Sequence, residues 1–197
     1  MRFFRRLWIL GVVLGVAMTF GGLIDFELGL AADATPQQMT CDELARSGPG
    51  DNAHIELREC VFALEAYAYT ERFGRRRWSY VPVWSMADAS KQMAGDDALL
   101  PFRVILKTDK WRTDEGIAAL GGLHSARGVV VNAIKDLDEE VKPILQESYP
   151  DVNLDTVWIF EHEREPPSRG RSFAWLLAGV LLLWLSIRGG RRGDPEA

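Results

Sequence analysis

Hydrophobic residues are concentrated in two blocks near the ends of the chain. The first block runs from Leu7 to Ile24, eighteen residues without a charge, and three arginines precede it at positions 2, 5 and 6. That length and that basic flank predict a membrane-spanning helix whose N-terminus lies in the cytoplasm. A cleaved signal peptide is the alternative, because Ala32-Asp33-Ala34 has the small-x-small form of a processing site. We expect an uncleaved anchor, since this site lies well beyond the apolar block.

The second block, Phe173 to Ile187, has fifteen residues and is rich in leucine. A span usually needs at least about 17 residues, so a second membrane helix would need Arg171 and Arg188 to reach the interface with their long side chains. A buried core helix is the alternative. Arginines outside both blocks predict that both termini are cytoplasmic and that the middle of the chain is exported. In a bacterial cell membrane that segment would be periplasmic or extracellular.

The blocks divide the chain into seven parts. They are a cytoplasmic basic start (1–6), a first transmembrane helix (7–24), a spacer (25–39), an extracytoplasmic domain (40–165), a linker (166–172), a second transmembrane helix (173–187) and a cytoplasmic tail (188–197). In layout, this arrangement resembles that of membrane-bound oxidase assembly factors. The resemblance extends to no motif, and it implies no site residue.

Alternating and helical patterns in the middle segment predict an α+β domain with a mixed β-sheet and two to three helices. Thr40 to Glu43 has the form of a capping box that opens a short helix. Gly74 lies between two aromatic-rich arms that predict a hairpin. The remaining expected elements are strands at 54–58, 102–107, 128–133 and 156–161, and helices that begin at Thr113 and at Asp136.

The turn of the predicted hairpin is basic and aromatic. Arg75, Arg76, Arg77 and Trp78 follow Gly74 directly. Such a tip is suited to contact lipid headgroups or an acidic partner. The alternative is a solvated turn whose charges keep an edge strand soluble.

The charge and the cysteine content of the domain indicate which partners it disfavours and which redox compartment it suits. Residues 25–170 hold 26 carboxylates against 16 Lys and Arg, a net charge of −10, which disfavours nucleic acid as a partner. Cys41 and Cys60 are the only cysteines. We expect a disulfide between them in an oxidising compartment, with two buried free thiols as the alternative.

The chemistry-bearing residues form no recognised catalytic motif. The segment Gly48 to His54 is the strongest candidate, because a rigid turn could present Asp51, Asn52 and His54 together for acid–base chemistry or for a ligand. Asp and Asn are equally common in turns as backbone caps. Glu161-His162-Glu163 is interpreted as a charged strand end, and no metal site or cofactor is expected.

The leading expectation is therefore a non-enzymatic interaction or assembly factor. Its expected partners are the lipid bilayer and another membrane or envelope protein. The alternative is a membrane-tethered enzyme or small-ligand receptor that uses the Gly48–His54 turn.

Overall fold

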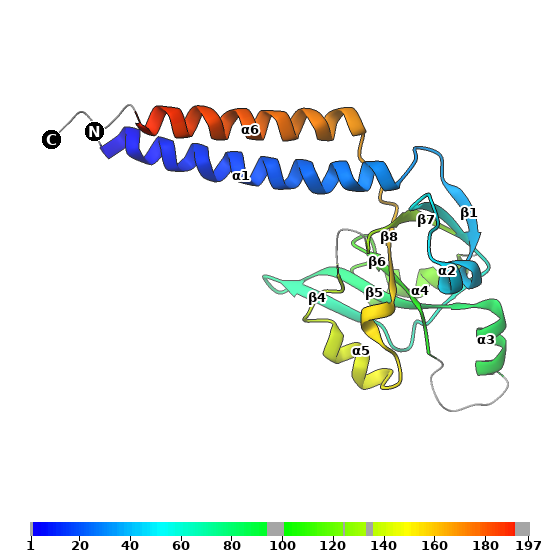
Figure 1. Cartoon of the computed structure of the whole chain (residues 1–197). Coiled ribbons are helices and arrows are strands. Elements are labelled where there is room, and N and C mark those ends of the chain that lie inside the picture. Colours follow the sequence, from blue (N-terminus) through cyan, green and yellow to red (C-terminus); the bar gives the residue numbers. More distant parts are fainter. Residues whose placement is uncertain (1, 94–100, 124, 133–135, 192–197) are drawn as a thin grey trace. The chain divides into compact units, whose positions relative to one another are not determined.

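The computed structural model describes residues 2–93, 101–123, 125–132 and 136–191. The chain forms two compact units (Figure 1). One unit combines Met1–Leu30 with Pro167–Ala197, and the other is Ala31–Pro166. We call them the helical unit and the domain.

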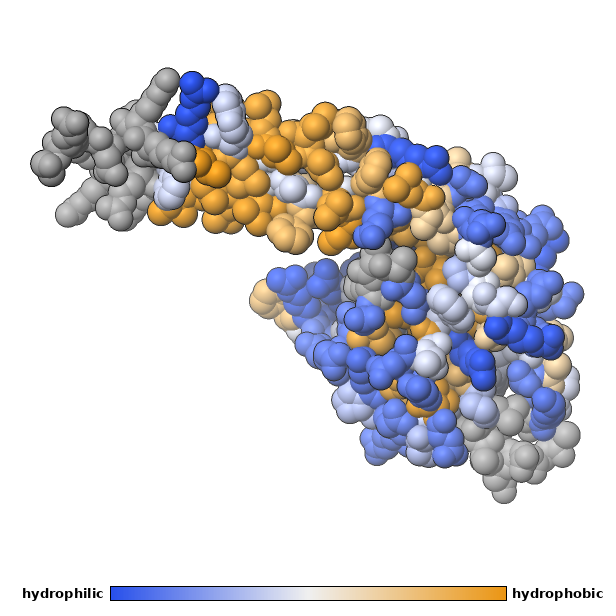
Figure 2. All heavy atoms as spheres, in the orientation of Figure 1, coloured by the Kyte–Doolittle hydropathy of each residue, from blue (hydrophilic) through white to orange (hydrophobic). Residues whose placement is uncertain are grey.

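The helical unit consists of α1 (Arg2–Ala31) and α6 (Arg169–Arg191). Both helices are long and apolar enough to cross a membrane, and little of either apolar stretch is buried. Apolar side chains cover the visible face of this unit in Figure 2. The 23 residues of α6 span about 35 Å, so the helix is longer than its fifteen-residue apolar core. The first helix continues to Ala31, and residues 25–31 are therefore helical although the sequence favoured a spacer there.

Glycines bring α1 and α6 close together. A Cβ atom added at Gly15 or at Gly22 would lie 2.8 or 2.7 Å from atoms of Leu183 or Leu176. Gly11 approaches Ser186 in the same way, so Gly11 and Gly15 form a G-x-x-x-G pair on the face of α1 that meets α6. Small residues at this spacing allow close backbone approach between membrane helices, where packing rather than water exclusion drives association.

The domain is built on one mixed sheet. The strand order is β1-β2-β7-β8-β6-β5-β3, and β4 pairs with β5 beside β3. The pairs β1–β2 and β6–β8 are parallel, and the other pairs are antiparallel. The strands are β1 (Gln37–Thr40), β2 (His54–Arg58), β3 (Cys60–Phe62), β4 (Ala68–Arg72), β5 (Arg75–Ser85), β6 (Val104–Thr108), β7 (Ser125–Val130) and β8 (Trp158–His162).

Four short α-helices lie in the described part of the domain, more than the two or three expected. They are α2 (Cys41–Ser47), α3 (Met86–Met93), α4 (Asp114–Ala119) and α5 (Lys142–Ser148), with 3₁₀ turns η1 (Leu120–Gly122) and η2 (Leu154–Thr156). The predicted capping box is present at α2, where Thr40 and Glu43 exchange hydrogen bonds. The helix α3 is not among the elements expected from the sequence, and it begins where the Ser85 hydroxyl accepts the Asp88 amide.

Strand pairing aligns an unusual set of side chains in one row across the sheet. Direct partners place His54, Val129, Glu161, Lys107 and Tyr80 side by side. None of the five is more than 6% exposed. Since buried polar groups are costly unless they are hydrogen-bonded or paired, this row needs internal partners.

The sulfur atoms of Cys41 and Cys60 form a disulfide that joins the start of α2 to β3. Their Cα atoms are 5.5 Å apart, within the usual range for a bridge. The pairing expected from the sequence is therefore present, and it fits an oxidising compartment.

Candidate functional site

The turn before β2 brings Asn52 and His54 into one hydrogen-bonded unit. Gly48 and Gly50 both adopt positive φ, at 72° and 64°. The Asn52 side chain accepts the Asp33 and His54 amides at 2.9 Å and donates to the Thr35 carbonyl at 3.1 Å. Asn52 therefore ties this turn to residues 33–35.

His54 is fully buried, and both of its ring nitrogens are engaged. Nδ1 lies 2.8 Å from the Asp33 carbonyl, which can only accept, and Nε2 lies 3.2 Å from Nε of Arg127, which can only donate. These partners select the neutral tautomer with the proton on Nδ1. The ring is thus held as a link between two segments, whereas Asp51 in the same turn is exposed.

The arginines that follow Gly74 separate into two groups. Arg75 and Arg77 are exposed. Arg76 pairs with Asp114 at 3.0 Å, and its guanidinium lies 4.1 Å from the Tyr69 ring centroid. The hydrogen bond from Tyr67 and the pairing with Arg76 lower the pKa of the Asp114 carboxyl. Arg76 therefore stabilises the fold locally.

Trp78 also faces the domain interior. The ammonium of Lys107 lies 4.8 Å from the centroid of the Trp78 ring. The four residues proposed from the sequence as a membrane or partner contact thus do not form one surface, because Arg76 and Trp78 pack on the domain.

An ionic network surrounds Lys107 in the buried row. The Lys107 ammonium lies 3.5 Å from Asp138 and 3.6 Å from Glu161, and the lysine side chain is 1% exposed. The Tyr80 hydroxyl donates to Asp138, and Arg164 pairs with the second oxygen of Glu161. Burial, and then the Asp138 acceptor, raise the pKa of the Tyr80 hydroxyl. We call this set the Lys107 cluster: Lys107, Tyr80, Asp138, Glu161 and Arg164.

The end of β8 forms one rim of a surface depression of about 530 Å³. Glu163 has a φ of 55°, and its amide donates to the Arg127 carbonyl at 2.7 Å, so the chain turns out of the sheet there. Gly128 permits the close approach, because a Cβ atom at that position would lie 2.1 Å from the Glu161 carbonyl oxygen. We call this feature the charged depression. It is lined by Glu56, Trp111, Leu123, Ser125, Ala126, Arg127, His162, Glu163, Arg164 and Glu165.

Aromatic packing forms part of this lining. The His162 ring stacks on Trp111 with 4.7 Å between centroids. Burial, helped by the positive charge of Lys110, lowers the pKa of His162 to about 4, so the imidazole is neutral near pH 7. Its Nδ1 is buried without a hydrogen-bond partner in the part of the chain that the structure describes. His162 is therefore a neutral, largely buried ring that packs beside Trp111 under the depression.

Charged side chains of both signs surround this aromatic pair, and most are held in place. His54 holds Arg127, Arg58 holds Glu56 at 2.8 Å, and Lys110 holds Glu163.

Comparisons of the chain with protein-family models, with curated proteins and with solved structures find no match.

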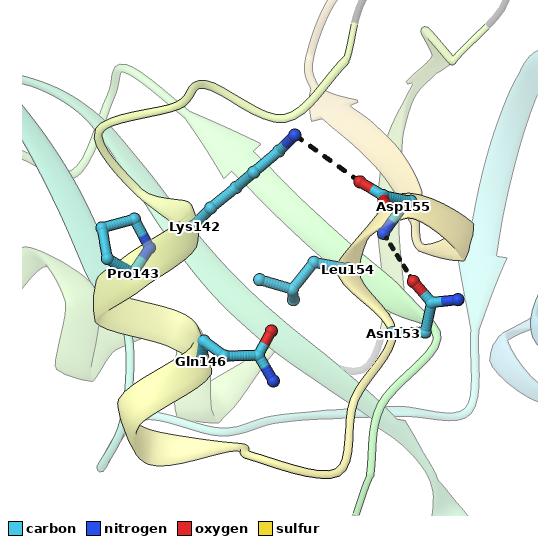
Figure 3. Close-up of a pocket in the computed structure, with 6 residues that line it drawn as sticks. All are labelled: Lys142, Pro143, Gln146, Asn153, Leu154 and Asp155. Atoms are coloured by element: carbon cyan, nitrogen blue, oxygen red, sulfur yellow. Dashed lines mark hydrogen bonds and ion pairs between the residues drawn. The ribbon is translucent and has the colours of Figure 1, made fainter.

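A second pocket lies between α5 and η2 (Figure 3). Its polar groups bind one another: Lys142 lies 3.5 Å from Asp155, and the Gln146 amide donates to the carbonyls of Tyr149, Pro150 and Val152. These contacts fasten the end of α5 to the following turn. We therefore interpret the pocket as part of the packing between α5 and the following turn.

The described residues include no group of three or more His, Cys, Asp or Glu side chains that could hold a metal ion. Within them, the charged depression brings side chains of both charges around the Trp111–His162 pair. Sequence reasoning missed that surface, since its parts come from β2, β7, the segment before α4 and the end of β8. The one local signal was the run of charges from Glu161 to Glu165.

Proposed function

We propose that this protein is a membrane-anchored, non-enzymatic interaction or assembly factor. In this proposal the helical unit spans the membrane, both termini are cytoplasmic, and the domain acts at the outer face. The domain there binds another membrane or envelope protein. Two apolar helices that bracket a disulfide-bonded domain support this arrangement.

The charged depression is the observation that carries the binding role. Tryptophan and arginine are enriched where protein interfaces concentrate their binding energy. The depression offers both, since Trp111 is half-buried and Arg127 is exposed but held by His54. The carboxylates of Glu56 and Glu163 line the depression together with its arginines, so a polypeptide with charges of both signs would complement the surface better than a phosphate-rich ligand.

Cross-linking tests this role in the native membrane. A photoreactive phenylalanine analogue at Ser125, which lines the depression, should capture one specific protein when it is incorporated in the full-length chain. The same analogue at Ser90, an exposed serine of α3, provides the matched control. Equal yields at the two positions would contradict the proposal.

Charge reversal tests whether the captured protein uses the depression. Arg127→Glu should reduce the cross-linking yield at Ser125 at least about tenfold, because it replaces attraction with repulsion and releases the His54 contact. Arg46→Glu reverses an exposed arginine of α2 that pairs only with Asp42 among the described residues, and it should leave the yield unchanged. Reporter fusions at each terminus test the orientation separately.

A membrane-tethered enzyme or small-ligand receptor that uses the Gly48–His54 turn is the second candidate. The observation in its favour is the hydrogen bond from Arg127 to His54, which links that turn to the charged depression. Asp51 is the exposed polar residue of the turn. An Asp51→Ala variant that folds normally and keeps full cellular function would remove this candidate.

A further inference from the structure

The β4–β5 turn exposes a phenylalanine in an unfavourable backbone conformation. Phe73 is 92% exposed, the highest value among the exposed large hydrophobic residues of the described chain. Its φ is 55°, and Gly74 follows with a φ of 69°. Two-residue hairpin turns with positive φ at both positions favour Asn-Gly or Gly-Gly, because a bulky side chain in this region is strained. Neither burial nor turn geometry therefore explains a phenylalanine here.

Two arginines flank the turn that carries this phenylalanine. The Arg72 guanidinium lies 5.4 Å from the Phe73 ring centroid, and Arg75 follows Gly74 directly. Both arginines are exposed, and neither forms an ion pair within the described residues. We call Arg72, Phe73, Gly74 and Arg75 the hairpin tip. Arg77 adds a further exposed positive charge two residues along β5.

The hairpin tip differs in charge from the domain that carries it. Residues 25–170 have a net charge of −10, whereas the tip has two arginines and no carboxylate. A positive, aromatic point on an acidic domain attracts an anionic surface while the remainder of the domain is repelled. This charge distribution favours an oriented contact at one point.

We propose that the hairpin tip contacts the anionic headgroup layer of a lipid membrane, with Phe73 inserted at the level of the headgroups and Arg72 and Arg75 on the phosphates. Exposed arginines near an anionic membrane each strengthen surface association by about fivefold. An aromatic ring beside them is suited to the interface, where one side is apolar and the other is wet. The chain's two apolar helices supply a reason for a membrane to be close to the domain.

The test uses the full-length protein in lipid nanodiscs with its disulfide intact. A nitroxide label is attached to Phe73→Cys, and its collision rates with dissolved oxygen and with a water-soluble nickel chelate are compared. In nanodiscs that contain phosphatidylglycerol, the label should gain oxygen contact and lose nickel contact relative to nanodiscs of phosphatidylcholine alone. A label at Glu65→Cys, an exposed turn residue of the same domain, should remain accessible to nickel in both.

A double reversal, Arg72→Glu with Arg75→Glu, should reduce the membrane-contacting population of the Phe73 label by at least about tenfold. Label accessibility at position 73 that is the same in both lipids and equals that at position 65 would overturn the proposal. Cross-linking of a photoreactive analogue at position 73 to one protein in the native membrane, with no lipid-dependent protection, would also overturn it and identify the tip as a protein contact. Loss of the Ser125 cross-link leaves this result unaffected, so the two proposals can fail separately.

Discussion

The Lys107 cluster gives the sharpest test of how the domain is stabilised. Lys107→Met keeps the length of the side chain and removes its charge, which leaves Asp138 and Glu161 near each other without the ammonium that lies 3.5 and 3.6 Å away. Removal of one partner from a buried ion pair typically costs about 3–5 kcal/mol, because the other charge stays desolvated. Asp138 keeps the Tyr80 hydroxyl and Glu161 keeps Arg164, so we expect the lower end, about 3 kcal/mol.

The assay is thermal unfolding of the full-length protein in detergent, followed by near-ultraviolet circular dichroism. For a domain of this size, about 3 kcal/mol corresponds to a fall in Tm of about 10 °C. Lys110→Met is the matched control, since the side chain of Lys110 is 53% exposed and its ion pair with Glu163 lies at the surface. That variant should change stability by less than about 1 kcal/mol. Equal effects of the two substitutions would refute the view that burial makes the Lys107 cluster costly to break.

Three further outcomes are expected. The pKa of His162 is about 6.5 in the unfolded chain and about 4 in the folded protein. The contribution of the neutral imidazole to stability is therefore complete above pH 6.5 and is lost as the pH falls from 6.5 to 4. Unfolding at pH 7 and pH 4.5 should reveal a loss of about 2–3 kcal/mol that His162→Phe removes, and an unchanged pH dependence in that variant would count against the assignment. Cys60→Ser opens a bridge with a sequence separation of 19 and should cost about 3 kcal/mol in denaturant unfolding, matched by wild-type protein under reducing conditions. Phe73→Asn should relieve the strain of the positive φ and stabilise the domain by about 1 kcal/mol. Ile144→Asn on α5 should not stabilise the domain. A less stable Phe73 variant would show that the turn is not strained.

Local signals in the sequence were sufficient for several elements of the fold. Thr40 and Glu43 predicted the start of α2 because a capping box depends on two residues three positions apart. Gly74 predicted the β4–β5 hairpin since positive φ at that position favours glycine. By contrast, β1 has four residues with no buried side chain, so it leaves no alternating apolar pattern to detect.

The helix expected to begin at Asp136 starts later in the structure. The helix α5 begins at Lys142 with Pro143 in its first turn, a position that proline favours. Residues 136–141 lie outside the helix, and Asp138 among them pairs with Lys107 in the Lys107 cluster. The sequence predicted a helix start at Asp136, whereas Asp138 has a tertiary partner that no local pattern contains.

The candidate site was harder to predict for the same reason. Every residue of β6 is buried, so Lys107 has no face of the strand from which to reach water. Alternation along the sequence cannot reveal this, because it shows which residues share a face and not whether both faces are covered. His54 likewise looked like a catalytic candidate in an unusual turn, and only the fold discloses that Asp33 and Arg127 occupy its nitrogens.

The strand order affects how the domain folds while the chain is synthesised on the ribosome. The last strand in the chain, β8, lies between β7 and β6, so without Trp158–His162 the sheet separates into a β1-β2-β7 fragment and a β6-β5-β3 fragment with unpaired edges. Strands that are distant in sequence pair slowly. Until they pair, the unpaired strand edges can bind other chains and lead to aggregation. Synthesis must therefore pass β8, and almost reach the second apolar helix, before the domain can close. We expect a product truncated before Trp158 to expose these unpaired edges and to be degraded instead of persisting as a smaller domain.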